Sequence, residues 1–325
     1  MSTQENFQQL KTHLQKVIVG QESLLERLMI SMLTGGHLLL EGPPGLAKTT
    51  AVKTLAEAVK ASFQRIQFTP DLMPGDVMGS DILDPKTGQL NFVKGPIFNE
   101  IVLADEINRA PPKVQSALLE AMAEKQVTAG GLTRTLPEMF IVMATQNPLE
   151  QSGTYPLPEA QLDRFMLHVV LDYPSEEEEL EILRRDRSHH FGEDKESLGA
   201  FLTPETVLAA RHEISEQYVS PEVEKYMVSL IAATRHLGRY EPSLEGVVEI
   251  GASPRASLSL LHSASALAWL NGRDFVTPDD VVQLLPDILR HRISVSFSGR
   301  AQQWNEDSII EKIIELVAVP LAEAS

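Results

Sequence analysis

The chain has 325 residues, 43% of them hydrophobic and 22% charged, which is the composition of an ordinary globular protein long enough for one large or two medium domains. A formal net charge of −17 repels nucleic acid and anionic membranes on average, although an oligomer can still carry a local basic channel. The absence of cysteine excludes disulfides and thiol catalysis and favours a cytoplasmic location. The sequence has no N-terminal apolar run and no apolar stretch near ~20 residues, so we expect no secretory signal and no membrane span.

The first informative element is a predicted strand at residues 37–40, which runs into the segment GPPGLAKT at 42–49 and then a helical pattern. A strand, a glycine-rich loop with Lys-Thr and a helix form the context of a phosphate-binding loop, because the loop N–H groups and the helix N-terminus face the phosphates. In this interpretation Lys48 reaches the β- and γ-phosphates and Thr49 binds Mg²⁺. Ala47 departs from the motif, since glycine is usual there. The alternative is a solvent-exposed turn.

Further apolar segments predict four more strands, separated by helical patterns. Several are apolar at nearly every position, as expected for parallel strands that are covered on both faces. We therefore predict an α/β fold, a P-loop NTPase with a five-stranded parallel sheet flanked by helices. The four additional strands are predicted at residues 63–68, 101–104, 140–144 and 166–171.

Two acids, Asp105 and Glu106, directly follow the strand at 101–104. Side chains at the carboxyl end of a parallel strand face the crevice in which such sheets bind ligands. Asp105 is predicted to hold Mg²⁺, directly or through water, and Glu106 to polarise the attacking water as general base. A plain polar turn explains one acid but not the pairing with an upstream phosphate loop, so the pattern predicts nucleoside triphosphate hydrolysis. Asn147 follows the next strand, where an Asn-Pro turn is the simpler interpretation.

The strand pattern ends before Ser175, a good helix N-cap that precedes the acidic run at 176–179. This run is typical of a solvated helix start. From there to the end the sequence shows helical patterns and no clear strand. We predict a nucleotide-binding core at residues 1–174 and a smaller all-helical domain at residues 175–325.

Taken in order, these segments resemble those of the AAA+ ATPases, and within them the MoxR family of the helix-2-insert clade. The resemblance covers nearly the whole chain, and the ordered set is specific although each piece alone is weak. MoxR-type proteins commonly carry alanine at the position of Ala47, so this departure favours the family. The matching segments are Val19-Gly20-Gln21, GPPGLAKT at 42–49, LADEINRAPP at 103–112, ATQNP at 144–148, LPEAQLDRF at 157–165 and Ser253-Pro254-Arg255.

The resemblance implies ATP and Mg²⁺ as ligands and a role for each matching residue. Lys48 and Thr49 match Walker A, and Asp105 and Glu106 match Walker B, so that Thr49 and Asp105 are the implied metal ligands. Gly20 and Gln21 match the short motif that lies near the adenine, and they are part of the nucleotide-binding set. That set is Gly20, Gln21, Gly42, Pro43, Pro44, Gly45, Leu46, Ala47, Lys48, Thr49 and Thr50.

Three implied catalytic residues lie outside the Walker motifs. Asn147 matches sensor 1, which makes it a site residue rather than a plain turn. Arg164 matches the arginine finger, whose guanidinium reaches into the neighbouring subunit's site and neutralises charge on the transferring phosphoryl group. Arg255 matches sensor 2 at the start of a lid helix and acts either in cis or in trans. Arg109 is a further trans candidate, with a structural role as the alternative.

Two insertions also resemble the helix-2-insert clade. Residues 75–95 are similar to the hairpin that interrupts helix 2, and residues 126–136, with Gly130-Gly131 as the turn, to the hairpin before sensor 1. In related machines such hairpins face the pore of the ring and touch the substrate. The alternative is a pair of surface loops.

The resemblance implies a ring, a hexamer, in which ATP hydrolysis drives chaperone-like remodelling of a protein client. Maturation of enzyme complexes or insertion of metal cofactors is implied, with a partner that carries a von Willebrand factor A domain. The chain ends at Ser325 without such a domain, so we expect the partner to be a separate polypeptide.

Two other functions compete with this one. A nucleic-acid motor needs a basic hairpin, and the two insertions offer few basic residues, interspersed with acids, and one aromatic, Phe92. A nucleotide-binding scaffold without turnover needs neither a general base nor an arginine finger, so the intact set argues against it.

Overall fold

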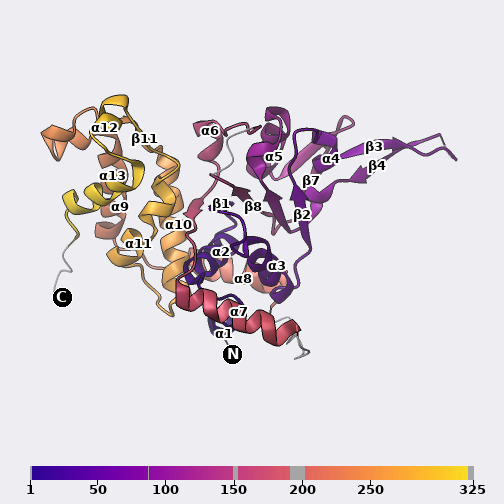
Figure 1. Ribbon diagram of the computed structural model, residues 1–325, viewed down its shortest axis with the longest axis horizontal. Coiled ribbons are helices and arrows are strands. Elements are labelled where there is room, and N and C mark those ends of the chain that lie inside the picture. Colours follow the sequence, from indigo (N-terminus) through magenta and orange to yellow (C-terminus); the bar gives the residue numbers. More distant parts are fainter. Residues whose placement is uncertain (1, 87, 149–152, 191–201, 321–325) are drawn as a thin grey trace. The chain divides into compact units, whose positions relative to one another are not determined.

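The computed structural model describes residues 2–86, 88–148, 153–190 and 202–320. The chain divides into two compact units. The first contains Met1–Leu157 and Val169–Ala209, and the second contains Pro158–His168 and Ala210–Ser325. Figure 1 shows the strands of the central sheet in the first unit and the helical bundle of the second.

A five-stranded sheet forms the centre of the first unit, in the order β2-β5-β8-β1-β9. The pairs β2–β5, β5–β8 and β1–β8 are parallel. All eight residues of β5 and β8 from 101–104 and 141–144 are fully buried, which explains their unbroken apolar sequence. The predicted strands and the α/β fold are confirmed. The strand bounds are β1 Leu38–Glu41, β2 Phe63–Gln67, β5 Ile101–Asp105, β8 Ile141–Gln146 and β9 Leu167–Val170.

The strand order brings the ends of distant segments to one edge. Glu41 at the end of β1 pairs with Gln146 at the end of β8, and Gln67 at the end of β2 pairs with Asp105 at the end of β5. Strand β1 therefore lies beside a strand formed about a hundred residues later, with its loop at the carboxyl edge of the sheet. Open α/β sheets bind their ligands at this edge, where the strand order reverses.

Helices surround this sheet. Helix α1 begins at a capping box, in which the Ser2 hydroxyl accepts from the Glu5 N–H at 3.2 Å and the Ser2 N–H donates to the Glu5 carboxylate at 2.8 Å. Helix α2 ends at Gly35, which has a left-handed φ of 70°. The helices are α1 Thr3–Val17, α2 Glu22–Thr34, α3 Lys48–Ala58, α5 Pro112–Glu124, α7 Glu176–His190 and α8 Pro204–Ser215, with 3₁₀ turns η1 Pro96–Phe98 and η2 Ile107–Arg109.

Both insertions form antiparallel hairpins, as predicted. Helix α4 (Pro74–Met78) leads into β3 (Gly79–Leu83) and β4 (Leu90–Lys94), and this hairpin projects away from the sheet (Figure 1). Strands β6 (Gln126–Ala129) and β7 (Leu132–Thr135) are joined by two glycines with positive φ, the geometry of a type I′ turn.

Contacts between side chains join the two hairpins. The guanidinium of Arg134 on β7 lies 3.7 Å from the ring centroid of Phe92 on β4. The turn at Gly130 lies so close to the Asp81 carboxylate of β3 that a Cβ would overlap with it. The aromatic ring that a nucleic-acid motor needs for base stacking is thus covered by an arginine of the same chain.

The second unit is helical, as predicted, apart from one short strand pair that the sequence pattern did not indicate. Strands of three and two residues are too short to produce a recognisable alternation. Helix α10 is buried on most of its surface, which agrees with its nearly continuous apolar and small residues. The elements are α6 Glu159–Leu162, α9 Pro221–Arg235, η3 Leu237–Arg239, η4 Pro242–Leu244, β10 Val248–Ile250, α10 Pro254–Leu270, α11 Pro278–Leu289, β11 Ser294–Val295, α12 Phe297–Ala301 and α13 Glu306–Leu316.

Serine and threonine caps start the main helices of this unit. The hydroxyls of Ser220, Ser253 and Thr277 each accept an N–H of the following turn, and proline occupies the first helical position. Among the described residues, none of the helices combines the length and the apolar character needed to traverse a lipid bilayer.

Candidate active site

The loop between β1 and α3 has the geometry expected of a phosphate-binding loop. Ala47, immediately before α3, has a left-handed φ of 53°, a conformation that favours glycine over alanine. A Cβ at Gly42 would lie 2.8 Å from the carbonyl oxygen of Leu171, so no larger residue fits there without a shift of the backbone. Leu46 is buried, which anchors the loop, while Pro44 and Gly45 are exposed.

Lys48, the first residue of α3, points back over this loop. Its Nζ donates to the carbonyl of Gly42 at 2.7 Å. Burial lowers the pKa of Lys48, and the negative charges of Asp105, Glu41 and Glu106 oppose that shift. The amine is therefore a half-buried cation that faces the acids at the ends of β1 and β5.

Asp105 is held from two sides at the end of β5. The Thr145 hydroxyl on β8 donates to its Oδ1 at 2.6 Å. Arg65 on β2 donates to its Oδ2 through Nε at 2.9 Å and through Nη2 at 2.6 Å. Both Arg65 donors meet the same oxygen, while Thr145 holds the other, so each carboxylate oxygen has a charged or polar partner.

Glu106 has a left-handed φ of 58°, which is uncommon for a residue with a side chain. Its backbone N–H donates to the same Thr145 hydroxyl at 2.9 Å, so one threonine fixes both the Asp105 carboxylate and the backbone of Glu106. The Gln67 amide donates to Glu106 Oε2 at 2.8 Å, and Arg109 lies 3.3 Å from the same oxygen. Arg109 thus contacts the acid of its own chain.

Hydroxyl and carboxylate oxygens at this edge suit a hard divalent cation. Thr49 follows Lys48 on the first turn of α3, and Asp105 lies among the charges that act on Lys48. Oxygen donors of this kind, few in number and completed by phosphate oxygens, are those with which proteins bind Mg²⁺.

The remaining predicted residues of the first unit lie at the ends of other elements. Asn147 directly follows β8 and is half-buried. Gly20 and Gln21 lie immediately before α2, and the Glu178 carboxylate of α7 lies so close to Gly20 that a Cβ there would come within 2.8 Å of it. Thr50 is exposed on α3.

Arg164 and Arg255 belong to the second unit. Arg164 lies in the turn after α6, and Arg255 lies in the first turn of α10 with its Nη1 3.6 Å from Asp163 Oδ2.

Three residues of the site were not predicted, namely Arg65, Gln67 and Thr145. Arg65 and Gln67 stand two positions apart, which places them on one face of β2. Three polar residues in a five-residue strand are a usable signal, because they mark β2 as the exposed edge strand of the sheet. Thr145 carries no signal of its own, since only the register of β8 against β5 brings it to both acids.

Comparisons with known proteins agree with this geometry. Residues 37–167 match the model of the ATPase family associated with various cellular activities (AAA), and residues 243–313 match the AAA lid domain. Chaperone MoxR1 of Mycobacterium tuberculosis is 43% identical over 95% of this chain and 81% of its own length. Protein MoxR of Methylorubrum extorquens is 30% identical over 94% of this chain and 92% of its own length. A candidate ATPase from Cytophaga hutchinsonii, known from its crystal structure, has 44% identity and a TM-score of 0.90, with 98% of this chain and 96% of that one covered. The chain belongs to the MoxR family of AAA+ ATPases.

Proposed function

We propose that this chain is a Mg²⁺-dependent ATPase that works in a ring, a hexamer, and remodels protein complexes. The observation that carries the proposal is the meeting of Lys48, Asp105 and Glu106 at the carboxyl edge of the sheet, where Thr145 bonds the Asp105 carboxylate and the backbone N–H of Glu106. We assign nucleotide binding to a core of residues 1–174 and the lid function to residues 175–325.

The loop residues bind the nucleotide in this proposal. Lys48 neutralises phosphate charge, and Thr49 and Asp105 hold Mg²⁺, which when bound shields the negative charge of the phosphates. Arg65 must yield Oδ2 of Asp105 if the metal is to use it. Adenine is assigned to the segment before α2 that contains Gly20 and Gln21.

Hydrolysis requires a base and a stabiliser of the developing charge. Glu106 accepts the proton of the attacking water, and Asn147 positions that water or the γ-phosphate. Arg164 of a neighbouring subunit neutralises the charge of the transferring phosphoryl group, with Arg255 as a second guanidinium.

Glu106→Gln tests the base. The amide keeps the shape of the side chain but cannot take a proton, so we expect ATP turnover to fall by about 10²- to 10⁴-fold while ATP stays bound. Glu57→Gln, which neutralises an exposed acid on α3, is the matched control and is expected to leave turnover unchanged. Unchanged hydrolysis in the Glu106 variant would overturn the assignment.

The ring is tested by ATP hydrolysis per subunit over a range of protein concentrations, with Arg164→Ala alongside. Specific activity that rises with concentration and collapses in the variant is expected for sites shared between subunits. Activity that is independent of concentration and survives the substitution would show that each subunit works alone.

The remodelling role is supported by the relative named a chaperone and by the projecting hairpin β3–β4. Ile82, Leu83 and Leu90 on this hairpin are large apolar side chains that are more than half exposed. We assign contact with the client protein to the two hairpins. A von Willebrand factor A domain protein is the proposed separate partner, and insertion of a metal cofactor into the client is one proposed form of remodelling. Replacing Ile82 and Leu90 with serine is expected to abolish client remodelling and to leave basal ATP hydrolysis unchanged.

A further inference from the structure

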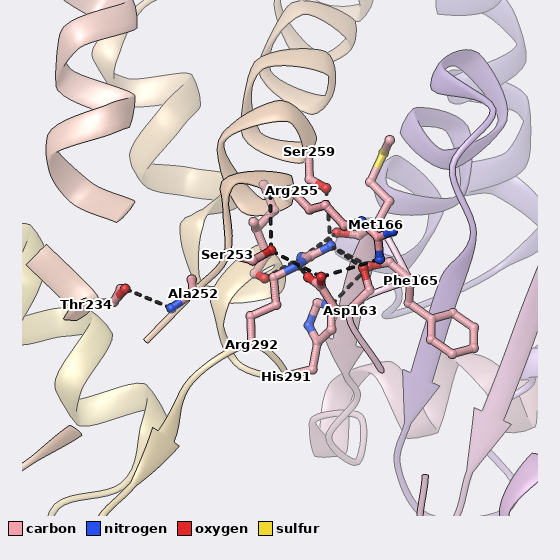
Figure 2. Close-up of polar contacts among 11 residues, drawn as sticks. Asp163, Phe165, Met166, Thr234, Ala252, Ser253, Arg255, Ser259, His291 and Arg292 are labelled. Atoms are coloured by element: carbon pink, nitrogen blue, oxygen red, sulfur yellow. Dashed lines mark hydrogen bonds and ion pairs between the residues drawn. The ribbon is translucent and has the colours of Figure 1, made fainter. Parts of the chain in front are cut away.

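A buried guanidinium lies between α11 and β11 in the second unit. The side chain of Arg292 is 2% exposed, yet all three of its nitrogens donate hydrogen bonds. Its Nε donates to Asp163 Oδ1 at 2.8 Å, and its Nη1 donates to the carbonyls of Ile288 at 2.6 Å and Met166 at 3.1 Å. Its Nη2 donates to the carbonyl of Phe165 at 2.6 Å and to the Ser259 hydroxyl at 3.2 Å. Figure 2 shows the guanidinium among Asp163, Phe165, Met166 and Ser259.

Most of these acceptors belong to one short segment, residues 163–166, which contains Arg164. Arg292 bonds the residue before Arg164 through its side chain and the two residues after it through their backbone carbonyls. The neighbouring His291 also contacts the Phe165 carbonyl, through Nε2 at 3.0 Å. The backbone on both sides of Arg164 is therefore fixed by the segment that follows α11.

Asp163 links the same segment to the start of α10. Its Oδ2 accepts from the Ser253 hydroxyl at 3.1 Å and lies 3.6 Å from Nη1 of Arg255 (Figure 2). One carboxylate thus receives Arg292 on one oxygen and the first turn of α10 on the other. The residue next to Arg164 is thus joined to the first turn of α10, which contains Arg255.

The chemistry of the cluster favours orientation over stability as its purpose. A buried ion pair adds little stability compared with apolar side chains of the same volume, because both charges lose their hydration. A planar guanidinium with five fixed donors does what apolar packing cannot, which is to impose one direction on every acceptor around it.

We propose that Arg292 is a positioning residue for the ATPase reaction: with Asp163 it holds Arg164, and Arg255 beside it, in the orientation that a neighbouring subunit's site requires. This inference rests on the proposed trans role of Arg164. All of these residues lie in the second unit.

Steady-state kinetics of Arg292→Lys give the first test. Lysine keeps the charge but offers no planar fork, so we expect kcat to fall by about a hundredfold through misplacement of Arg164, with KM for ATP unchanged. Arg273→Lys is the matched control, since Arg273 forms a close two-pronged pair with Asp280 in the same unit, away from residues 163–166. Asp163→Asn is measured in parallel, and a thermal unfolding curve is recorded for each variant. If one variant proves to be misfolded, the kinetics of the other variant still test the proposal.

Mixing subunits separates orientation in trans from a purely structural role. Lys48→Ala subunits have a defective site of their own but still offer Arg164 to a neighbour. Mixed with them, Arg164→Ala subunits should recover activity, and Arg292→Lys subunits should recover it to a similar extent. Recovery of the first mixture but not the second would overturn the positioning role and leave the proposed function standing. Failure of both would refute the trans role of Arg164, and the inference with it.

Discussion

The two prongs of Arg65 on Asp105 lead to a prediction about the Mg²⁺ requirement. If Asp105 is a metal ligand, the cation competes with a guanidinium that already occupies Oδ2 at 2.6 and 2.9 Å. Removing the guanidinium by Arg65→Met should free this oxygen and make the surroundings of the acid more negative. We therefore expect the variant to reach half-maximal hydrolysis at a lower Mg²⁺ concentration than the unaltered protein.

The exposure of the pair sets the size of the effect. The Arg65 side chain is 48% exposed and that of Asp105 is 17% exposed, so solvent screens much of their attraction. Exposed ion pairs contribute about 0.2–1 kcal/mol, and two N–H donors on one oxygen of a largely buried acid place this one near the upper end. A difference of about 1 kcal/mol corresponds to about fivefold in the half-saturating Mg²⁺ concentration.

The assay is ATP hydrolysis at saturating nucleotide, titrated with Mg²⁺ at low and high ionic strength. Lys53→Met removes an exposed charge from α3 and serves as the control for net charge. The difference between Arg65→Met and the unaltered protein should shrink at high salt. A half-saturating concentration that stays the same or rises in Arg65→Met would refute the competition.

Three further predictions follow from contacts of single residues. Gln67→Leu removes the amide that donates to the Glu106 carboxylate at 2.8 Å. We expect basal ATP turnover to rise about fivefold, which corresponds to the loss of a partly exposed hydrogen bond of about 1 kcal/mol. Unchanged turnover would show that this contact does not restrain the base. Ala47→Gly relieves a left-handed φ of 53° and should raise the free energy of unfolding by up to about 1 kcal/mol, whereas Ala51→Gly inside α3 should lower it by about that amount in the same urea titration. Burial and the charge of Arg292 lower the pKa of His291 far below its ordinary value, so below about pH 6.5 the unfolded chain binds a proton that the folded chain does not. The free energy of unfolding should therefore be level above that pH and fall by about 1.4 kcal/mol per pH unit below it. His291→Gln should flatten this dependence, measured as the urea midpoint at each pH.

The sequence predicts those parts of the fold that repeat a local rule. Residues 101–104 are apolar without interruption because β5 is covered on both faces, and GPPGLAKT specifies a loop whose turn is encoded within eight residues. Hairpin β6–β7 is predictable for the same reason, since two glycines suffice for its turn. The strand pair β10–β11 is not, because five residues show no period.

Contacts that depend on register or on distant packing leave no such local trace. Thr145 bonds the Asp105 carboxylate and the Glu106 N–H only because β8 lies beside β5 in one register, and shifting that register by one residue would turn its hydroxyl to the opposite face. Arg292 and Asp163 are 129 residues apart, and neither carries a motif that refers to the other. Motifs thus identify the charges that perform chemistry, while the residues that orient them emerge only from the folded chain.

Each charge of the first-unit site is paired within the chain. Lys48 donates to the Gly42 carbonyl, Asp105 receives Arg65, and Glu106 receives Gln67. A nucleotide with its metal must exchange these partners one for one, so part of its binding free energy is used in rearranging the site rather than in affinity. If a neighbour's Arg164 completes the site as proposed, we expect weak basal hydrolysis in isolated subunits, because Glu106 stays bonded to Gln67 there. Substitutions at Arg65 and Gln67 would then raise the activity of the isolated subunit more than that of the assembled ring, an ordering that a site preformed for catalysis would not show.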